Sequence, residues 1–119
     1  TSRDITSINL DSRTIEINRG AFYNCYSLTS ITLPSSLTSI GDRAFSGCSG
    51  LKEVIIDSAY VYTNATSTSA CGSLFNNSSI TTVKVLSSLD DGTNSYITTN
   101  FTKGPTEVIG GKSYTVYSK

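Results

Sequence analysis

The chain has 119 residues, which is long enough for one domain with a modest hydrophobic core. Nine basic residues balance nine acidic ones, so charge favours neither nucleic acid nor an anionic membrane as a partner. Histidine is absent, which removes the commonest general base and the usual zinc ligands, and no apolar run approaches the roughly 18 residues of a transmembrane helix.

Residues 5–56 repeat one pattern with a spacing of 23 residues. This spacing aligns Ile8 with Ile31 and Val54 without a gap. Each of these positions lies in a short run that alternates apolar and polar residues, as in LTSITL (28–33), and such alternation predicts a strand. Because so short a unit cannot bury its own apolar face, we expect the units to stack, with their strands paired in parallel about 4.8 Å apart.

The rest of each unit is predicted to consist of turns and a second extended run. The sequence PSSLTSIGD (34–42) predicts a turn followed by a short strand, with Pro34 and Gly41 as punctuation. The sequence RAFSGCSGL (43–51) predicts a tight helical or 3-10 turn that closes the unit and directs Phe45 inward. We therefore expect a mainly β chain with short helical or 3-10 turns.

A third copy of the pattern is displaced along the chain. SLFNNSSITTVKV (73–85) aligns with the second copy at a spacing of 29 residues, which places Val83 on Val54. The six extra residues lie in a polar insertion at about residues 58–73. Keeping the spacing at 23 would instead place Asn77 on Val54, at a buried strand position, and we reject that register.

Two columns of equivalent residues follow from this alignment. They are Leu28, Leu51 and Ile80, and Cys25, Cys48 and Asn77. We expect the first column to point into one shared core. For Cys25 and Cys48 we favour buried, unbridged thiols over a disulfide, because parallel side chains suit a bridge poorly. Asn77 inherits the cysteine position, where we expect its amide to bond free backbone groups of the turn.

The repeat pattern fades in the last quarter of the chain. DDGTNS (90–95) predicts a turn, and EVIGGKSYTVY (107–117) predicts a hairpin around its Gly-Gly pair. We expect this hairpin to cover the last repeat or, alternatively, to begin a neighbouring domain. The predicted organisation is a repeat domain at 1–92 and a capping or assembly segment at 93–119.

Two kinds of modifiable side chain stand outside the core pattern. Three cysteines is an odd number, so at least one thiol is unpaired within the chain, and Cys71 in the polar insertion is the candidate for an exposed thiol or an interchain bridge. Asn64, Asn100 and Asn76 each begin an N-glycosylation sequon. We prefer Asn64 first, because it lies in the segment predicted to be most exposed, and Asn100 second.

The combination of A-F-x-x-C-x-x-L-x-x-I-x-L, a Pro-Ser-Ser turn and SIGDRAF (39–45) resembles the BspA-like leucine-rich repeats over about residues 1–90. The resemblance implies a right-handed leucine-rich-repeat solenoid of about three and a half 23-residue coils with a hairpin-like cap. Such proteins occur on the surfaces of bacteria and of some parasitic protists and are described as adhesins and extracellular binding modules. The resemblance therefore implies no catalytic residue and no cofactor.

The sequence as a whole favours a secreted or cell-surface protein that is not an enzyme and that binds a protein or a glycan. Abundant serine and threonine suit a solvent-facing β surface, and the lack of methionine leads us to interpret the chain as a processed or excised segment. The alternative is a subunit of a glycosylated extracellular fibre, in which copies of the chain stack head to tail through uncapped ends. In either case we expect no nucleic acid partner and no membrane span.

Overall fold

The computed structural model describes residues 5–8, 10–66 and 68–119 of the chain. The elements in chain order are β1 (Ser7–Ile8), β2 (Glu16–Ile17), β3 (Ser30–Leu33), β4 (Ser39–Ile40), β5 (Glu53–Ile56), α1 (Ala59–Asn64), α2 (Ala70–Ser73), the 3-10 helix η2 (Leu74–Asn76), β6 (Thr82–Leu86), α3 (Ser95–Asn100), β7 (Thr102–Ile109) and β8 (Lys112–Ser118). Short strands with a few short helices are the predicted content.

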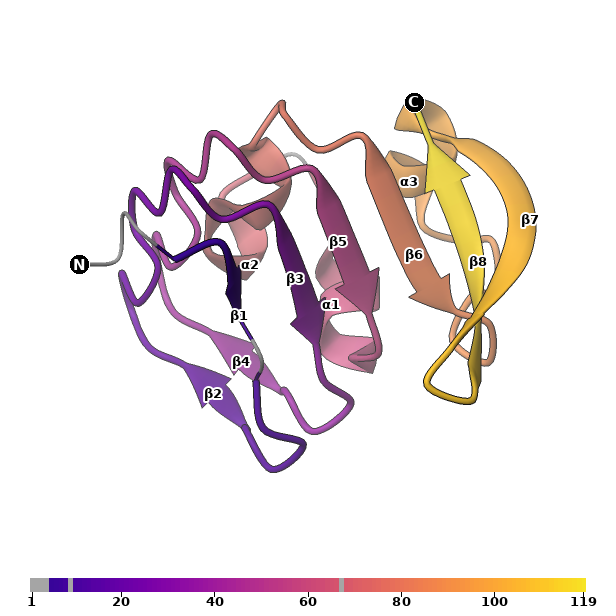
Figure 1. Cartoon of the computed structure of the whole chain (residues 1–119), viewed down its shortest axis with the longest axis horizontal. Coiled ribbons are helices and arrows are strands. Elements are labelled where there is room, and N and C mark those ends of the chain that lie inside the picture. The colour runs from indigo at the N-terminus through magenta and orange to yellow at the C-terminus, as the bar shows by residue number, and fades with distance from the viewer. Residues whose placement is uncertain (1–4, 9, 67) are drawn as a thin grey trace.

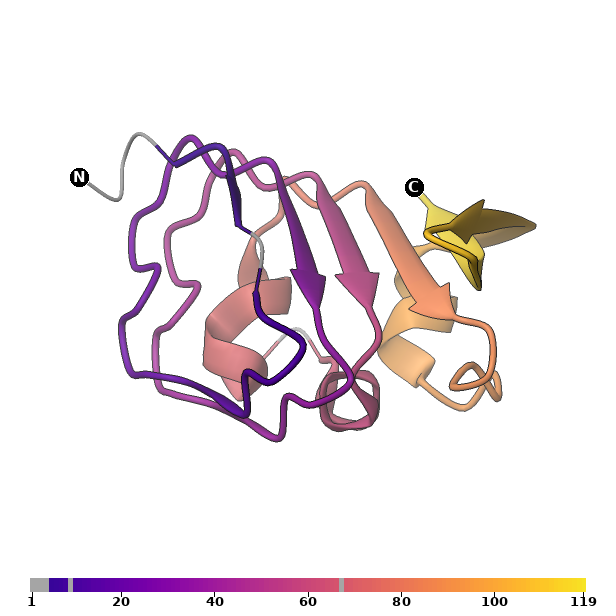
Figure 2. The same cartoon turned by 60° about the horizontal axis from the view of Figure 1, so that its bottom comes forward.

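Six of the strands form one sheet in the order β1-β3-β5-β6-β8-β7. β1, β3, β5 and β6 run parallel, while β8 pairs antiparallel with β6 and carries β7 on its other side (Figure 1). β2 and β4 form a separate two-stranded parallel ladder. Figure 2 shows the parallel strands side by side, with α1 below β5 and α3 below β6.

The pairing register confirms the alignment of the repeats. Ile8 pairs with Ile31, Ile31 with Val54, and Val54 with Val83. The last pair spans the predicted spacing of 29 residues, so the register that would place Asn77 on Val54 is excluded. The insertion therefore lengthens the third repeat without disturbing the strand ladder.

One hydrophobic core runs through the repeats, because inward strand positions alternate with outward ones. In β3, Ile31 is 1% exposed, while the next residue, Thr32, is half-buried. The side chains of Leu28, Leu51 and Ile80 are 0%, 0% and 1% exposed and belong to a single hydrophobic cluster. Full burial of each such side chain contributes roughly 1.5–3 kcal/mol, so this column is a main source of stability.

The turns that close successive repeats share a left-handed backbone conformation. Gly20, Arg43 and Gly72 occupy equivalent positions and have φ of 65°, 59° and 64°. At Gly72, an added Cβ would lie 2.8 Å from Ala44 Cβ and 2.9 Å from Gly41 O. The second and third repeats approach so closely here that a side chain at Gly72 has no space.

The polar insertion folds into helical turns that pack on the repeats. Within and just after it, α1, α2 and η2 bury Val61, Tyr62, Cys71, Leu74 and Phe75. Cys71 is 3% exposed, which corrects the prediction of an exposed thiol at this position. The reason is that Phe45 N donates to Gly72 O at 2.9 Å, which holds the added residues against the second repeat.

The other two cysteines are also buried, and all three thiols are free. Cys25 and Cys48 are each 0% exposed. Burial raises the pKa of Cys48 and that of Cys71 to about 11. Both thiols are therefore in the protonated, unreactive form near neutral pH.

We expect iodoacetamide to leave the three cysteines of the native protein unmodified at about pH 8, because the thiolate is the nucleophile and access is blocked. In denaturing urea, intact-mass spectrometry should show three adducts. Modification of Cys71 in the native protein at the rate found in urea would contradict its burial.

Two short helices take the same place in the third and fourth repeats. α1 follows β5 and α3 follows β6, just as β2 follows β1 and β4 follows β3. Ser58 Oγ accepts from Val61 N at 3.2 Å and caps α1, and Asn94 Oδ1 accepts from Ile97 N at 2.9 Å and caps α3. Asn94 Nδ2 also donates to Tyr62 O at 2.7 Å, which joins the fourth repeat to the third.

The C-terminal hairpin forms around the predicted Gly-Gly turn and extends the sheet beyond β6. Tyr117 of β8 pairs with Val83 and is 2% exposed. Its hydroxyl donates to Asp90 Oδ2 at 2.7 Å. The hairpin is thus held to the last parallel strand by the backbone ladder and by a buried side chain.

Candidate functional site

Asn77 stands at the position that cysteine holds in the preceding repeats, and it makes an equivalent contact. Cys48 Sγ donates to Phe22 O of the repeat before it at 3.3 Å, and Asn77 Nδ2 donates to Phe45 O at 2.9 Å. Asn77 Nδ2 also donates to Leu74 O of its own turn at 2.9 Å. One amide therefore satisfies backbone carbonyls in two adjacent repeats, which is a structural role.

The outward face of the large sheet presents side chains of successive repeats in rows. One row consists of Ser30, Glu53 and Thr82, and the next of Thr32, Ile55 and Lys84. Ile55 is 9% exposed, and the others are half-buried. Ser30 Oγ donates to Glu53 Oε1 at 3.1 Å. The face is therefore a mainly polar surface built on paired strands.

Lys84 is the centre of an ion-pair cluster on this face. Its Nζ lies 3.0 Å from Glu53 Oε2 of β5 and 3.0 Å from Glu107 Oε2 of β7. Burial lowers the pKa of Lys84, but hydrogen bonds and charge from Glu107 and Glu53 outweigh it, so the pKa is raised above its ordinary value. The cluster ties the hairpin to the parallel strands and neutralises most of the charge at this part of the face.

Two buried tyrosines of β8 contact carboxylates. Burial and the carboxylate of Asp57 raise the pKa of Tyr114 above its ordinary value. Burial and the hydrogen bond to Asp90 do the same for the pKa of Tyr117. Asp57 is itself 7% exposed, and its Oδ2 lies 3.4 Å from Lys112 Nζ. These contacts require protonated tyrosines.

We expect the free energy of unfolding to fall as the pH rises above about 10. Tyrosines of the unfolded chain deprotonate near pH 10, whereas Tyr114 and Tyr117 keep their protons to higher pH in the fold. Alkaline pH therefore favours the unfolded chain. Urea unfolding between about pH 8 and about pH 11 measures the effect, and the double substitution Tyr114→Phe, Tyr117→Phe should flatten the decline. A midpoint that stays constant over this range would contradict these contacts.

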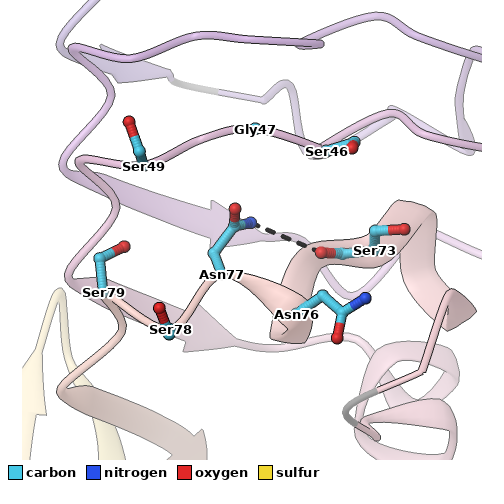
Figure 3. A pocket seen from close by; sticks show the side chains of 8 residues that line it. All are labelled: Ser46, Gly47, Ser49, Ser73, Asn76, Asn77, Ser78 and Ser79. Carbon is cyan, nitrogen blue, oxygen red and sulfur yellow. Dashed lines mark hydrogen bonds between the residues drawn. The ribbon is translucent and has the colours of Figure 1, made fainter.

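A hollow opens between the turns of the second and third repeats, and we call it the serine hollow (Figure 3). It has a volume of about 370 Å³ and is lined by Ser46, Gly47, Ser49, Ser73, Asn76, Asn77, Ser78 and Ser79. None of these residues is charged. Asn77 is held as described, and Ser79 Oγ donates to Leu51 O at 2.5 Å. Among the described residues, the other hydroxyls of the lining and the Asn76 amide make no side-chain hydrogen bond within the chain.

A second hollow, of about 330 Å³, lies beside α1. Its polar groups already bond one another. Tyr62 OH donates to Asp91 Oδ1 at 3.0 Å, and Thr93 Oγ1 donates to the same oxygen at 2.6 Å. This hollow therefore offers a ligand fewer unused hydrogen-bonding groups than the serine hollow does.

The three sequon asparagines are exposed but lie in different settings. Asn64 and Asn100 end α1 and α3, where their amides donate to Tyr60 O and Tyr96 O, each at 2.8 Å. Asn76 lies in the wall of the serine hollow. Glycosylation at all three positions stays a prediction.

Neither surface was singled out from the sequence. Serine is so frequent in this chain that the four free hydroxyls of the hollow do not stand out from their neighbours. Lys84 becomes notable only when β5, β6 and β7 are in register, since its two partners lie far from it in sequence. The 29-residue spacing, which brings two turns of unequal length together, was the available signal for the hollow.

Within the described ranges, no three side chains of histidine, cysteine, aspartate or glutamate lie close enough together to hold a metal ion. The helices of this part of the chain are too short and too polar to cross a bilayer.

Comparison with protein families identifies the repeats. The BspA type leucine rich repeat region matches residues 1–102 in six copies. Neither the comparison with curated proteins nor that with solved structures gives a match. The matched region contains every parallel strand of the large sheet and extends through α3. Because the match covers most of the sequence, the chain belongs to the BspA-type leucine-rich-repeat family.

Proposed function

We propose that the chain is a non-catalytic binding module, secreted or held at a cell surface, whose ligand is a protein or a glycan. Membership of a family of surface repeat proteins supports the extracellular setting. The observation that carries the binding role is the outward sheet face, where successive repeats present side chains in rows about 4.8 Å apart. A ligand that lies across the strands meets one side chain from each repeat, on elements that paired backbones hold rigid.

We further propose that the repeats wind as a right-handed solenoid whose last turn the hairpin covers. The edge strand β7 supports this role, because it contains Pro105, the charged residue Lys103 and a register shift between Lys103 and Thr106. Prolines, charges and irregular pairing oppose the addition of another strand. Head-to-tail stacking into a fibre therefore has little to support it at this end, and we rank it second.

Binding of the purified chain to arrays of extracellular-matrix proteins and cell-surface glycans tests the proposal. Thr32→Arg adds a long cation to the outward sheet face and should weaken binding to the captured ligand at least tenfold. Thr99→Arg is the matched control, because Thr99 is exposed on α3 and off the sheet. Equal binding by the two variants, or no ligand on any array, would count against the sheet face.

Size-exclusion chromatography separates binding from fibre formation. A binding module should elute as a monomer, whereas a fibre subunit should form long assemblies even at low concentration. Filaments seen by negative-stain microscopy at the concentration of the binding assay would replace the first proposal by the second.

A further inference from the structure

We propose that the serine hollow and the two tyrosines on the adjoining turn form a second binding site, for a neutral saccharide. The site rests on the proposed function only for its extracellular setting, because it lies on the turns of the repeats and not on the outward sheet face. What brings the site together is the stacking of three successive turns, which places the exposed Tyr23 and Tyr26 beside Ser46 and Ser49.

The lining of the hollow selects for an uncharged ligand rich in hydroxyl groups. A charged group that entered would lose water without gaining an ionic partner, since no lining residue is charged. Each free hydroxyl of Ser46, Ser49, Ser73 and Ser78 both donates and accepts, and the amide of Asn76 does the same through separate atoms. Sugar hydroxyls have this dual capacity, so the two sets of groups match.

The back of the hollow is fixed before a ligand arrives. The Asn77 amide is held by Phe45 O and Leu74 O, each at 2.9 Å, and Ser79 Oγ is held by Leu51 O. Figure 3 shows Asn77 between the two turns, with Ser49 and Ser78 on either side of it. A preformed wall spares the ligand the entropy cost of ordering it.

The adjoining turn supplies aromatic rings. Asn24 N donates to Ser46 O at 2.8 Å, so residues 23–26 lie directly against the turn that forms one wall of the hollow. Tyr23 and Tyr26 are 48% and 45% exposed, and the equivalent residues of the second repeat are Ser46 and Ser49. A tyrosine ring offers an apolar face and a polar edge, which suit the C–H face and the hydroxyls of a pyranose ring.

Size also fits a small carbohydrate. A volume of about 370 Å³ lies at the lower end of the roughly 300–1,000 Å³ range of ligand pockets, so it takes one or two sugar rings and not a folded partner. A peptide would be expected to need an apolar anchor pocket, which this lining of serine, glycine and asparagine does not provide.

Titration of the isotopically labelled chain, made in bacterial cytosol so that Asn76 carries no glycan, tests the site by NMR. The probes are methyl galactoside, methyl mannoside, N-acetylglucosamine and cellobiose, with glucose 6-phosphate and a tyrosine-containing peptide as competitors of other chemistry. We expect at least one neutral sugar to shift the backbone amides of Gly47, Ser49 and Ser78, with a dissociation constant of about 1 mM. No shift with the neutral probes, or shifts with the phosphate or the peptide only, would overturn the proposal.

Variants locate the response. Ser49→Leu removes a hydroxyl and fills part of the hollow, and Tyr23→Ala removes a ring, so each should weaken sugar binding at least tenfold. Both residues are exposed, so neither change removes a core contact. Thr32→Arg on the sheet face should leave the titration unchanged. Failure of the sugar titration, with Thr32→Arg still weakening capture on the arrays, would remove this site alone, and the converse result would remove the sheet-face proposal alone.

Discussion

Replacing Gly72 by alanine should lower the free energy of unfolding by about 3 kcal/mol or more. The left-handed φ of 64° costs a non-glycine residue roughly 1–2 kcal/mol. The new Cβ would also lie within 3 Å of Ala44 Cβ, Ala44 N and Gly41 O, and such overpacking costs typically about 1–3 kcal/mol. Backbone atoms make up two of these three neighbours, so the second and third repeats must separate to relieve the clash.

Gly92→Ala is the matched control for this variant. Gly92 has φ of 75°, and an added Cβ there would meet no atom within 4 Å. This control should therefore lose only the conformational part, roughly 1–2 kcal/mol. Urea unfolding of both variants measures the difference. Equal losses would show that the repeats are not in close contact at Gly72.

Asn77→Ala should lower the free energy of unfolding by about 2 kcal/mol or more. The change leaves Phe45 O and Leu74 O without their side-chain donor, and an unsatisfied buried acceptor costs about 1–3 kcal/mol. Asn77 is half-buried, so water replaces part of the loss and the estimate lies below the sum for two carbonyls. The same measurement on Asn76→Ala provides the control.

The neighbouring variants make this prediction specific. Asn76 is exposed and makes no side-chain hydrogen bond, so its replacement should change stability by less than about 0.5 kcal/mol. Asn77→Cys restores the residue type of the preceding repeat and one donor towards Phe45 O, so it should recover part of the loss. A fully stable Asn77→Ala would mean that the amide does not bridge the two repeats.

The strand ladder could be predicted from the sequence because its apolar positions are strict. Ile31, Val54 and Val83 must face one core, and a shift by a single residue would turn each strand inside out. The same constraint exposed the insertion, since only a spacing of 29 kept Asn77 out of the strand. Burial, and not local propensity, therefore determined the register.

The helices of the third and fourth repeats escaped prediction for a physical reason. α1 and α3 have six residues each, too few for a helical period to be recognised among serines and threonines. A signal was present, because SAYVYTN (58–64) and NSYITTN (94–100) share their tyrosine, aliphatic, threonine and asparagine positions. Composition alone suggested an exposed insertion, and tertiary packing buried Cys71 instead.

The candidate surfaces were harder to predict than the fold. Lys84 gains its meaning from Glu107, which reaches it only because the chain returns through the hairpin. The serine hollow depends on the geometry of two turns of unequal length, and serine side chains in turns carry no pattern that marks a pocket. Periodic apolar residues specify how the repeats stack, but they do not specify what the polar residues between them bind.

Backbone NMR of the isotopically labelled chain tests the in-register stack most directly. We expect interstrand NOEs that connect Val54 with Val83 and Ile31 with Val54, as the parallel ladder requires. NOEs that instead connect Val54 with Asn77 would contradict the stack, the hollow between its turns and the surface on its strands.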